Sequence, residues 1–471
     1  MRRTLASRQR PDWRTVAAAY LADPSEYWGP DAPRHADKLQ TKKQALHKRD
    51  GLSDTELIDA VVSMAAKRGH KRPAPVYVTG LGGSGSHWVS SMLSDLGGLA
   101  AAGEVYFPPR LLDALRAFDD ADQACAVDAI HLLHGWPRST DVWAEGIVNC
   151  AAGVTKLRLY KRWDRHAVGI HLVRDPRDQV LSVTFRKTGF RRYEDPEASD
   201  AEYLRRMAER NAASFDQSLS VADLIDIRCR YEDVCDDPRP LLRRVLQTLG
   251  RQADESAVER SAVMHDAATI RAGTGSTITN LDEGGRAASW RTTADPSRQR
   301  TLHMYLVEVI HGLGYEPGDC MGPPLPDHAL PARTLDFSST PPGPLYQRVD
   351  ATWTPLEGTD GRVEVPAETP VLLRIGAGTG DLSMLERCGG EDLQALCVAA
   401  NPGVVDDALR HLRRLTGLRT LDLARTAVTD AGLEHLEPLA GLQQVQLAET
   451  GTTAQGRARL AARMPQVTIW V

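Results

Sequence analysis

A glycine- and serine-rich turn between an apolar strand and an amphipathic helix constrains this chain more than any other feature. The stretch PVYVTGLGGSGSHWVSSMLSDLGG covers residues 75–98. Its apolar residues Val89, Met92, Leu93 and Leu96 have the i, i+3, i+4, i+7 spacing of one helix face. Glycines let the backbone fold around a ligand, and the free N–H groups and dipole of the following helix attract an anion. The sequence therefore predicts a phosphate-binding loop here.

The same loop departs from the pattern of nucleotide triphosphatases. Gly80 and Gly85 have the GxxxxG spacing of such enzymes, but Ser86 and His87 follow where Lys and Ser/Thr are expected. The Lys is needed on the terminal phosphates and the hydroxyl on magnesium. A kinase or ATPase is therefore disfavoured and stays open only as a third interpretation.

A second anion site is indicated by HLVRDPRDQVLSVTFRKTG at 171–189. A strand ends at Arg174, and Asp175 followed by Pro176 is a typical helix start. Ser182 lies about two turns into that helix. An Arg at the carboxyl end of a strand and a Ser on the next helix can jointly hold a second phosphate.

Four segments, in order along the chain, resemble the PAPS-dependent sulfotransferases over roughly residues 73–316. They are GGSGSHW (82–88), similar to the loop that grips the 5′-phosphosulfate; LVRDPRDQVLS (172–182), similar to the 3′-phosphate motif; RYEDVCDDPRPLLRRVLQTLG (230–250), similar to RYEDLxxDPxxxLxxxLxxLG; and SWR (289–291), after Gly285 and Arg286, similar to a terminal G-x-W-R region. The resemblance implies an α/β fold with a three-layer, P-loop-like parallel sheet flanked by helices. It also implies transfer of a sulfuryl group from PAPS to a hydroxyl or amine of an unknown acceptor, releasing PAP.

The resemblance also implies a role for each matching residue. The loop would surround the 5′-phosphosulfate, Arg174 and Ser182 would bind the 3′-phosphate with a contribution from Arg286, and Tyr231 would lie beside the adenine. The predicted cofactor-binding residues are Gly83, Ser84, Gly85, Ser86, His87, Trp88, Arg174, Ser182, Tyr231 and Arg286.

The catalytic residues are where this chain departs from the family. Gly83 stands where the family loop carries a Lys or Arg that stabilises the leaving group. His87, and Arg158 within a segment that resembles the family's VIKTHL strand, are the predicted replacement cations. Glu104 lies in GEVYFPPRLLDAL (103–115), which is similar to the GE-containing stretch of tyrosylprotein and glycan sulfotransferases. As a carboxylate it would take the acceptor proton if its pKa is raised.

Two further expectations concern ligands. No metal-ligand spacing is recognisable, so the sequence predicts no metal. The acceptor is a small molecule, a glycan or a protein. Because Gly83 replaces a catalytic cation, a second interpretation is a catalytically weak PAP- or PAPS-binding protein whose C-terminal part recruits a partner.

The pattern of apolar segments predicts the domain organisation. Residues 76–80, 154–160, 168–173 and 224–229 read as parallel strands that alternate with helices. The predicted domains are an N-terminal helical extension (1–72), the sulfotransferase domain (73–318), a Pro-rich linker (319–347) and a leucine-rich-repeat domain with a short N-terminal cap (348–471). Within the extension we expect helices near 13–21 and 55–64 and a solvated helix face at 39–50.

The last hundred residues contain an internal repeat with units 22 to 25 residues apart. The pattern LxxLxLxxN is matched by Leu393, Leu396, Val398 and Asn401, by Leu418, Leu421, Leu423 and Thr426, and by Leu442, Val445, Leu447 and Thr450; a weaker copy has Leu373, Ile375 and Gly378, and a half-copy has Met464, Val467 and Ile469. In such units the LxL strand contributes to a continuous core and the polar residue closes the turn. This resembles a small leucine-rich-repeat solenoid, whose strand face is suited to a protein or glycan partner.

Composition sets the remaining limits. The formal net charge of −5 gives no global reason to expect nucleic acid. Seven scattered cysteines without a CxxC pair indicate reduced thiols. No run of 18 apolar residues predicts a membrane span, and the basic start lacks the apolar stretch of a signal peptide. We therefore expect a cytoplasmic protein.

Overall fold

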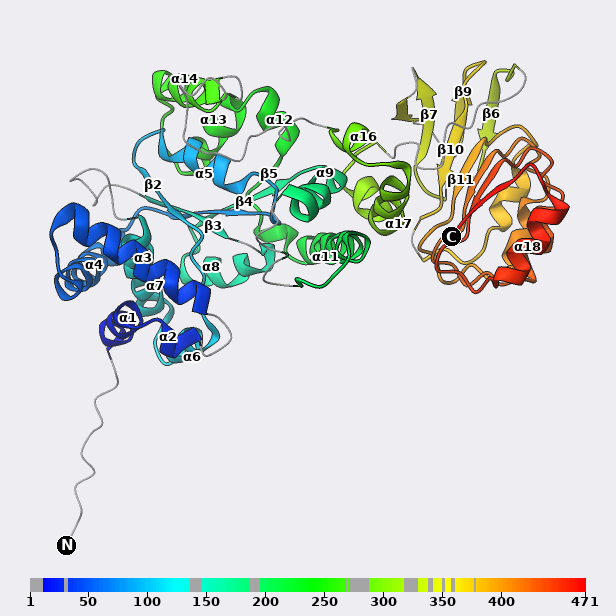
Figure 1. Cartoon of the computed structure of the whole chain (residues 1–471). Coiled ribbons are helices and arrows are strands. Elements are labelled where there is room, and N and C mark those ends of the chain that lie inside the picture. Colours follow the sequence, from blue (N-terminus) through cyan, green and yellow to red (C-terminus); the bar gives the residue numbers. More distant parts are fainter. Residues whose placement is uncertain are drawn as a thin grey trace, which may run out of the picture. The chain divides into compact units, whose positions relative to one another are not determined.

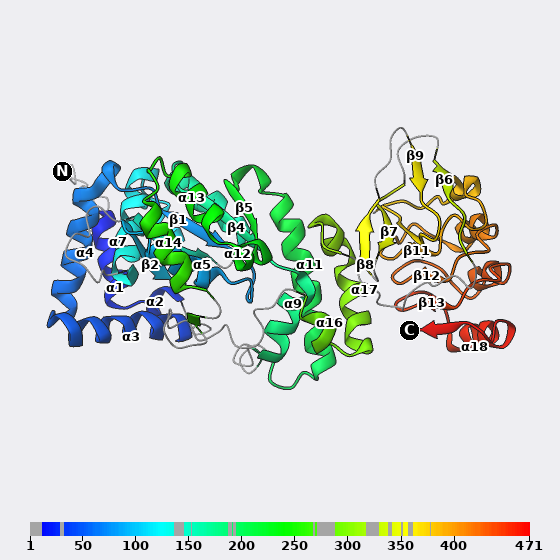
Figure 2. The same cartoon turned by 90° about the horizontal axis from the view of Figure 1, so that it is seen from above.

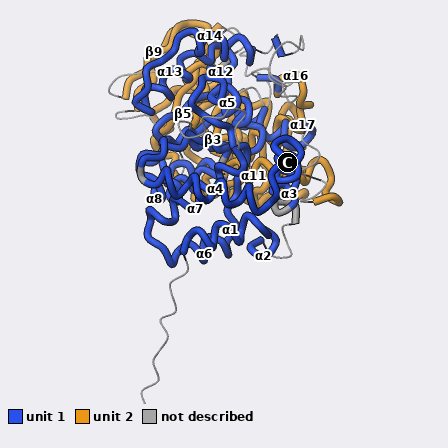
Figure 3. Tube along the Cα trace, turned by 90° about the vertical axis from the view of Figure 1, so that its left-hand side faces the viewer, with its two compact units in different colours: residues 1–190, 213–289 blue, residues 191–212, 290–471 orange. Residues whose placement is uncertain are grey.

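The structure is a computed structural model in which the chain forms two compact units. The first contains residues 1–190 and 213–289, and the second contains residues 191–212 and 290–471 (Figure 3). The described residues are 12–28, 33–135, 146–151, 153–186, 191, 195–266, 269–270, 288–316, 329–337, 342–349, 352–356, 361–376 and 378–471.

The first unit is built on a five-stranded parallel sheet with the strand order β2-β3-β1-β4-β5 (Figure 1). The strands are β1 (Val76–Thr79), β2 (Leu99–Gly103), β3 (Gly146–Ala151), β4 (Val168–Val173) and β5 (Ile227–Arg230). Alternate side chains of β1 point to opposite faces: Tyr77 joins one apolar core, and Val76 and Val78 join the other.

Helices cover both faces of this sheet (Figure 1). One face carries α1 (Trp13–Ala22), α2 (Ser25–Trp28), α3 (Pro33–Asp50), α4 (Asp54–Arg68), α6 (Pro109–Leu115), α7 (Asp120–Gly135) and α8 (Leu157–Trp163). The other carries α5 (Ser86–Ser94), α12 (Tyr231–Asp236), α13 (Arg239–Thr248) and α14 (Glu255–Met264). Helix α9 (Pro176–Leu181) follows β4 and continues as a π-helical turn, Ser182–Arg186, and α11 is Asp200–Leu219. The predicted parallel α/β sheet with helices on both faces is confirmed.

The predicted strands are confirmed at β1 and β4, and β5 lies slightly later than predicted. The predicted strand at 154–160 is wrong. The chain there forms a short 3₁₀ turn and then α8, and Leu157, Tyr160 and Trp163 are buried at a spacing of three residues. That spacing is helical, and the strand interpretation overlooked it. The sheet instead contains β3, between β2 and β1, which the sequence did not predict.

The N-terminal helices contribute to the core of the first unit. Trp13, Leu21 and Leu57 are buried in the core beneath the sheet. The segment 39–50 is helical, but it is not simply a solvated face. The side chain of Lys43 is fully buried, and its Nζ lies 2.9 Å from Asp54 Oδ2 and 3.1 Å from the Ala22 carbonyl.

We expect Lys43→Ala to lower the free energy of unfolding by about 2 kcal/mol. The change removes a charge-assisted hydrogen bond and leaves the Ala22 carbonyl without this donor. Lys48→Ala, at an exposed position of the same helix, should change stability by less than about 0.5 kcal/mol. Urea denaturation of both variants measures the difference, and equal losses would contradict a structural role for Lys43.

The second unit contains a seven-stranded sheet with the order β14-β13-β12-β11-β10-β7-β8 and a two-stranded sheet, β6-β9 (Figure 2). The strands are β6 (Arg333–Asp336), β7 (Leu345–Val349), β8 (Thr352–Pro355), β9 (Arg362–Val365), β10 (Val371–Arg374), β11 (Ala395–Cys397), β12 (Thr420–Asp422), β13 (Gln444–Gln446) and β14 (Thr468–Trp470). The helices are α16 (Trp290–Thr293), α17 (Pro296–Gly312) and α18 (Ala454–Arg463), with 3₁₀ turns at Ser383–Arg387, Asp406–Leu412 and Gly432–Leu436. Strands β10 to β14 are parallel, whereas β7 pairs antiparallel with both β10 and β8.

The register of β10 to β14 follows the repeat read from the sequence. Leu373, Leu396, Leu421, Val445 and Ile469 lie opposite one another in successive strands. The first four are at most 1% exposed, and all five contribute to one apolar cluster.

The polar residue of each clear repeat closes its turn, as the pattern predicts. The side chains of Asn401, Thr426 and Thr450 each donate to the carbonyl three residues earlier, at 3.2, 2.7 and 2.7 Å. Gly378 of the weaker copy has a φ of +80°, in the left-handed region that glycine tolerates. Membership of the leucine-rich-repeat class stays a prediction.

Helix α17 covers part of one face of the seven-stranded sheet, opposite the face that carries the apolar cluster of Leu373, Leu396 and Leu421. Met304 and Val307 of α17 pack with Cys397, Ala399 and Ala424, which point away from the leucine core. The helix therefore groups with these strands, although the sequence analysis placed residues 296–312 in the predicted 73–318 domain. Among the described helices, none is long and apolar enough to cross a membrane.

Candidate functional site

The turn from β1 into α5 has the backbone of an anion-binding loop. Gly83 and Gly85 have φ angles of +86° and +92°. Gly85 is the N-cap of α5 and offers no side chain to the first N–H groups of the helix. These groups and the helix dipole therefore face the loop and attract a negatively charged ligand.

Ser84 gives this loop a second feature. Its side chain is fully buried, and its Oγ has no hydrogen-bond partner in the described part of the chain. A Cβ built on Gly80 would lie 2.5 Å from this Oγ, so the hydroxyl packs beneath the loop against Gly80.

The second predicted anion site lies directly against the loop. Arg174 follows β4, which pairs with β1, and its Nη1 donates to the Gly83 carbonyl at 2.9 Å. Ser182 is on the same side, because a Cβ built on Gly83 would lie 3.6 Å from Ser182 Cβ. Asp175 caps α9 by accepting from the Arg177 N–H at 3.0 Å, so the predicted helix start is confirmed. The structure thus brings the two strand-to-helix corners together.

Two aromatic residues border the loop. The Arg174 guanidinium lies 4.5 Å from the centre of the Tyr231 ring, and a Cβ on Gly85 would come within 2.8 Å of that ring. Trp88 packs edge-on against Tyr231, with ring centres 5.6 Å apart, and its Nε1 donates to the His265 carbonyl at 3.1 Å.

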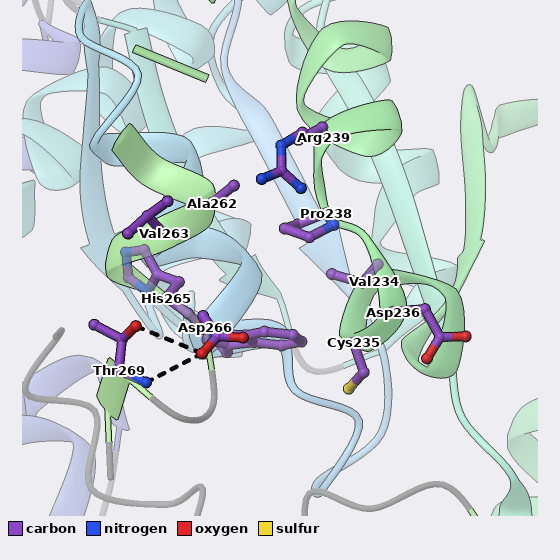
Figure 4. Close-up of a pocket in the computed structure, with 11 residues that line it drawn as sticks. Val234, Cys235, Asp236, Pro238, Arg239, Ala262, Val263, His265, Asp266 and Thr269 are labelled. Atoms are coloured by element: carbon purple, nitrogen blue, oxygen red, sulfur yellow. Dashed lines mark hydrogen bonds between the residues drawn. The ribbon is translucent and has the colours of Figure 1, made fainter. Parts of the chain in front are cut away.

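A pocket of about 330 Å³ lies beside Trp88 (Figure 4). Its wall includes Cys235, Val263 and Thr269, from the α12 region, α14 and the segment that follows α14. Asp266 accepts a hydrogen bond from the Thr269 N–H at 3.1 Å (Figure 4). The sequence did not predict this wall, because no motif marks the segment after α14.

The predicted catalytic residues His87 and Glu104 form an ion pair at the loop. His87 Nε2 lies 3.1 Å from Glu104 Oε1, and Lys38 Nζ lies 3.2 Å from Glu104 Oε2. Hydrogen bonds to Cys150 and Glu104 raise the pKa of His87 to about 10. The hydrogen bond from His87 lowers the pKa of Glu104 to about 2. Both groups are therefore charged at neutral pH, and the pKa of Glu104 is lowered, whereas its predicted role as a base requires a raised pKa.

Cys150 and Lys38 are the site residues that sequence reasoning missed. Cys150, near the end of β3, donates from its Sγ to the Ser86 carbonyl at 3.5 Å. Recognition of GIVNCA as a strand would have placed Cys150 at the same edge of the sheet as the loop. Lys38 on α3 carried no signal beyond its charge.

One predicted residue, Arg158, is not brought to the loop. Arg158 lies on α8 rather than on a strand, and it donates to the Ser220 carbonyl at 2.7 Å. None of its described contacts reaches the loop. Arg286 lies outside the described residues. Ser289, three positions later, donates from its Oγ to Asp178 of α9 at 2.7 Å.

Comparisons with known proteins give likenesses in structure alone. No family model and no curated protein matches the chain. A mouse sulfotransferase solved with PAP is similar over 53% of this chain and 91% of its own, with 13% identity and a TM-score of 0.36. A sulfotransferase from Mycobacterium avium covers 66% of this chain and 98% of its own, with 12% identity and a TM-score of 0.35. The sulfotransferase domain of the Synechococcus PCC 7002 olefin synthase covers 52% and 96%, with 20% identity and a TM-score of 0.31.

Proposed function

We propose that the first unit binds PAPS and transfers its sulfuryl group to a hydroxyl or amine, releasing PAP. The observation that carries the proposal is the hydrogen bond from Arg174 to the Gly83 carbonyl, with Ser182 beside it. It brings the two strand-to-helix corners side by side, which supports a ligand that contacts both. A nucleotide with a phosphosulfate on its 5′ side and a phosphate on its 3′ side offers one anion to each corner.

Each part of the nucleotide has a proposed partner. The N–H groups at the start of α5 hold the 5′-phosphosulfate, and Arg174 with Ser182 holds the 3′-phosphate. The pocket beside Trp88 takes the adenine ring, because its wall offers apolar atoms together with the polar groups of Asp266 and Thr269. A contribution of Arg286 to the 3′-phosphate site stays a prediction from the sequence.

His87 is the proposed replacement for the missing loop cation. In the transfer, a bond forms between the acceptor oxygen or nitrogen and sulfur, and the bond from sulfur to the bridging phosphate oxygen breaks. Negative charge develops on that bridging oxygen, and the imidazolium of His87 in the loop stabilises it.

Glu104 is the proposed acceptor of the proton released by the attacking group. In the free protein the hydrogen bond from His87 holds the pKa of Glu104 at about 2. A bound phosphosulfate brings a second anion to His87, and a nearby like charge raises the pKa of a carboxyl group. Cofactor binding therefore turns Glu104 from a partner of His87 into a base.

Incubation of the purified chain with ³⁵S-labelled PAPS and a panel of alcohols, phenols, amines and glycans tests the proposal. We expect label in at least one acceptor class together with stoichiometric release of PAP. ATP should compete poorly with PAP, because ATP lacks the 3′-phosphate. Equal competition by ATP would favour the kinase interpretation.

The second candidate is a PAP- or PAPS-binding protein with little transfer activity. Gly83 at the position of the usual cation favours it. Tight PAP binding without transfer to any acceptor class would support this candidate and exclude the enzyme.

We expect His87→Gln to lower the transfer rate by about 100-fold and to change PAP affinity much less, because the lost charge acts on the leaving oxygen. His166→Gln, at an exposed position of the same unit, serves as the control. Transfer by the unchanged protein should fall as pH rises toward about 10, where His87 loses its proton. An unaltered rate in His87→Gln would remove His87 from the mechanism.

We further propose that β10 to β14 and their turns form leucine-rich repeats that bind a protein or glycan. Because α17 packs on part of the strand face, a partner would use the remaining surface or displace that helix. A cytoplasmic location stays part of the proposal.

A further inference from the structure

We propose that His303, Cys397 and Asp422 bind one divalent transition-metal ion, with Zn²⁺ preferred. The three residues come from α17, β11 and β12 of the second unit, and one ligand atom of each lies within 4.8 Å of the others. The site is independent of the proposed transfer activity. The sequence could not reveal it, because the three residues lie in segments far apart along the chain.

The distances between the ligand atoms suit tetrahedral zinc. His303 Nε2 lies 3.1 Å from Asp422 Oδ2, and Cys397 Sγ lies 3.7 Å from the same oxygen. Ideal tetrahedral zinc with the usual bond lengths separates N from O by about 3.4 Å and S from O by about 3.6 Å. Both separations are within a few tenths of an ångström of these ideal values, and the ligand atoms of His303 and Cys397 lie within 4.8 Å of each other.

Strand register places two of the ligands side by side. Cys397 and Asp422 are directly opposite each other in the parallel pair β11–β12. Their chain neighbours Leu396 and Leu421 point into the leucine core, so Cys397 and Asp422 point to the face on which α17 packs. His303 reaches them from the helix.

Burial makes charge balance important at this site. Cys397 and Asp422 are 5% and 2% exposed, and His303 Nδ1 is a buried nitrogen without a hydrogen-bond partner among the described residues. A buried carboxylate is costly unless its charge is compensated. A dication held by one thiolate, one carboxylate and a neutral imidazole forms a site of zero net charge. The neighbouring Arg374 has its own counterion, Glu308, at 3.8 Å.

The ligand types select the class of metal. Sulfur and nitrogen ligands favour zinc and similar ions over calcium and magnesium, which prefer oxygen. The other oxygen of Asp422, Oδ1, accepts from the Ala424 N–H at 3.0 Å, and such an outer contact fixes the orientation of a ligand carboxylate. A water would occupy the fourth position. The bound ion would tie α17 to the repeat strands.

The test uses the full chain, stripped with a chelator and then titrated with Zn²⁺ or Co²⁺. We expect one equivalent of metal by mass spectrometry, a thiolate-to-cobalt charge-transfer band, and a higher thermal midpoint with Zn²⁺. Cys397→Ser should abolish the cobalt band and weaken zinc binding by about 100-fold or more, beyond the effect typical of outer-shell changes. Cys388→Ser, at another buried thiol of the same unit, should leave both unchanged.

A second variant keeps the test informative if Cys397→Ser does not fold. His303→Gln leaves both strand residues in place and should likewise lose the zinc-dependent rise of the thermal midpoint. The proposal is overturned if the unchanged protein binds well under one equivalent, or if either ligand variant binds zinc as tightly as Cys388→Ser.

Discussion

Gly85→Ala should abolish measurable PAP binding and lower the free energy of unfolding by about 3 kcal/mol. Gly85 has a φ of +92°, where an L-residue costs roughly 1–2 kcal/mol. The added Cβ would also lie 2.8 Å from two atoms of the Tyr231 ring. Overpacking of this kind costs about 1–3 kcal/mol and displaces the backbone that should hold the phosphosulfate.

Gly97→Ala separates the two causes. Gly97 has a φ of +80°, but a Cβ there meets no atom within 4 Å. This control carries the backbone strain without the clash, so it should lose about 1 kcal/mol and keep PAP binding. Isothermal titration with PAP and urea denaturation measure both quantities.

A double-mutant cycle tests the contact itself. In a Tyr231→Ala background the ring is absent, so Gly85→Ala should cost no more than Gly97→Ala. An undiminished cost in that background would show that Tyr231 does not set the tolerance of the loop for a side chain.

Local sequence patterns were sufficient to predict the loop and the α9 corner. The positive φ angles of Gly83 and Gly85 fall at residues that can adopt them, and the Asp175 cap with Pro176 is a local signal. Their convergence follows from the pairing of β1 with β4, which the alternation of strands and helices allowed but did not require.

Predictions failed where tertiary contacts decide the outcome. The basic residues of 154–160 read as part of a strand, whereas the burial of Tyr160 and Trp163 selects a helix and carries Arg158 to Ser220. Lys43 looked solvated because its partner Asp54 comes from the next helix. The pKa of Glu104 depends on His87 and Lys38, which no local pattern joins to it.

In the second unit the sequence repeat predicted the register of β10 to β14 well, because each repeat contributes one strand at a fixed spacing. It could not predict what covers the outer face of those strands. The sequence of α17 does not show which sheet it packs against, and its packing against residues such as Ala399 assigns it to the seven-stranded sheet.

Arg174→Ala should weaken PAP by about 10- to 150-fold and adenosine 5′-phosphosulfate far less. The lost contact to the 3′-phosphate is charge-assisted and contributes roughly 1.5–3 kcal/mol. Adenosine 5′-phosphosulfate has no 3′-phosphate, so it does not use that contact. Arg116→Ala, at an exposed arginine of the same unit, should affect neither ligand. Competition binding with both nucleotides measures the ratio.

Comparison of the two nucleotides also separates a lost phosphate contact from a loosened loop. Arg174 also donates to the Gly83 carbonyl, so its loss could loosen the loop and weaken every nucleotide. Loosening would lower both affinities by the same factor, whereas a lost phosphate contact lowers only that of PAP. Ser182→Ala supplies the independent check, because Ser182 has no described hydrogen bond to the loop and its removal should act on PAP alone. Equal losses for the two nucleotides in both variants would mean that this corner supports the loop and does not read the 3′-phosphate.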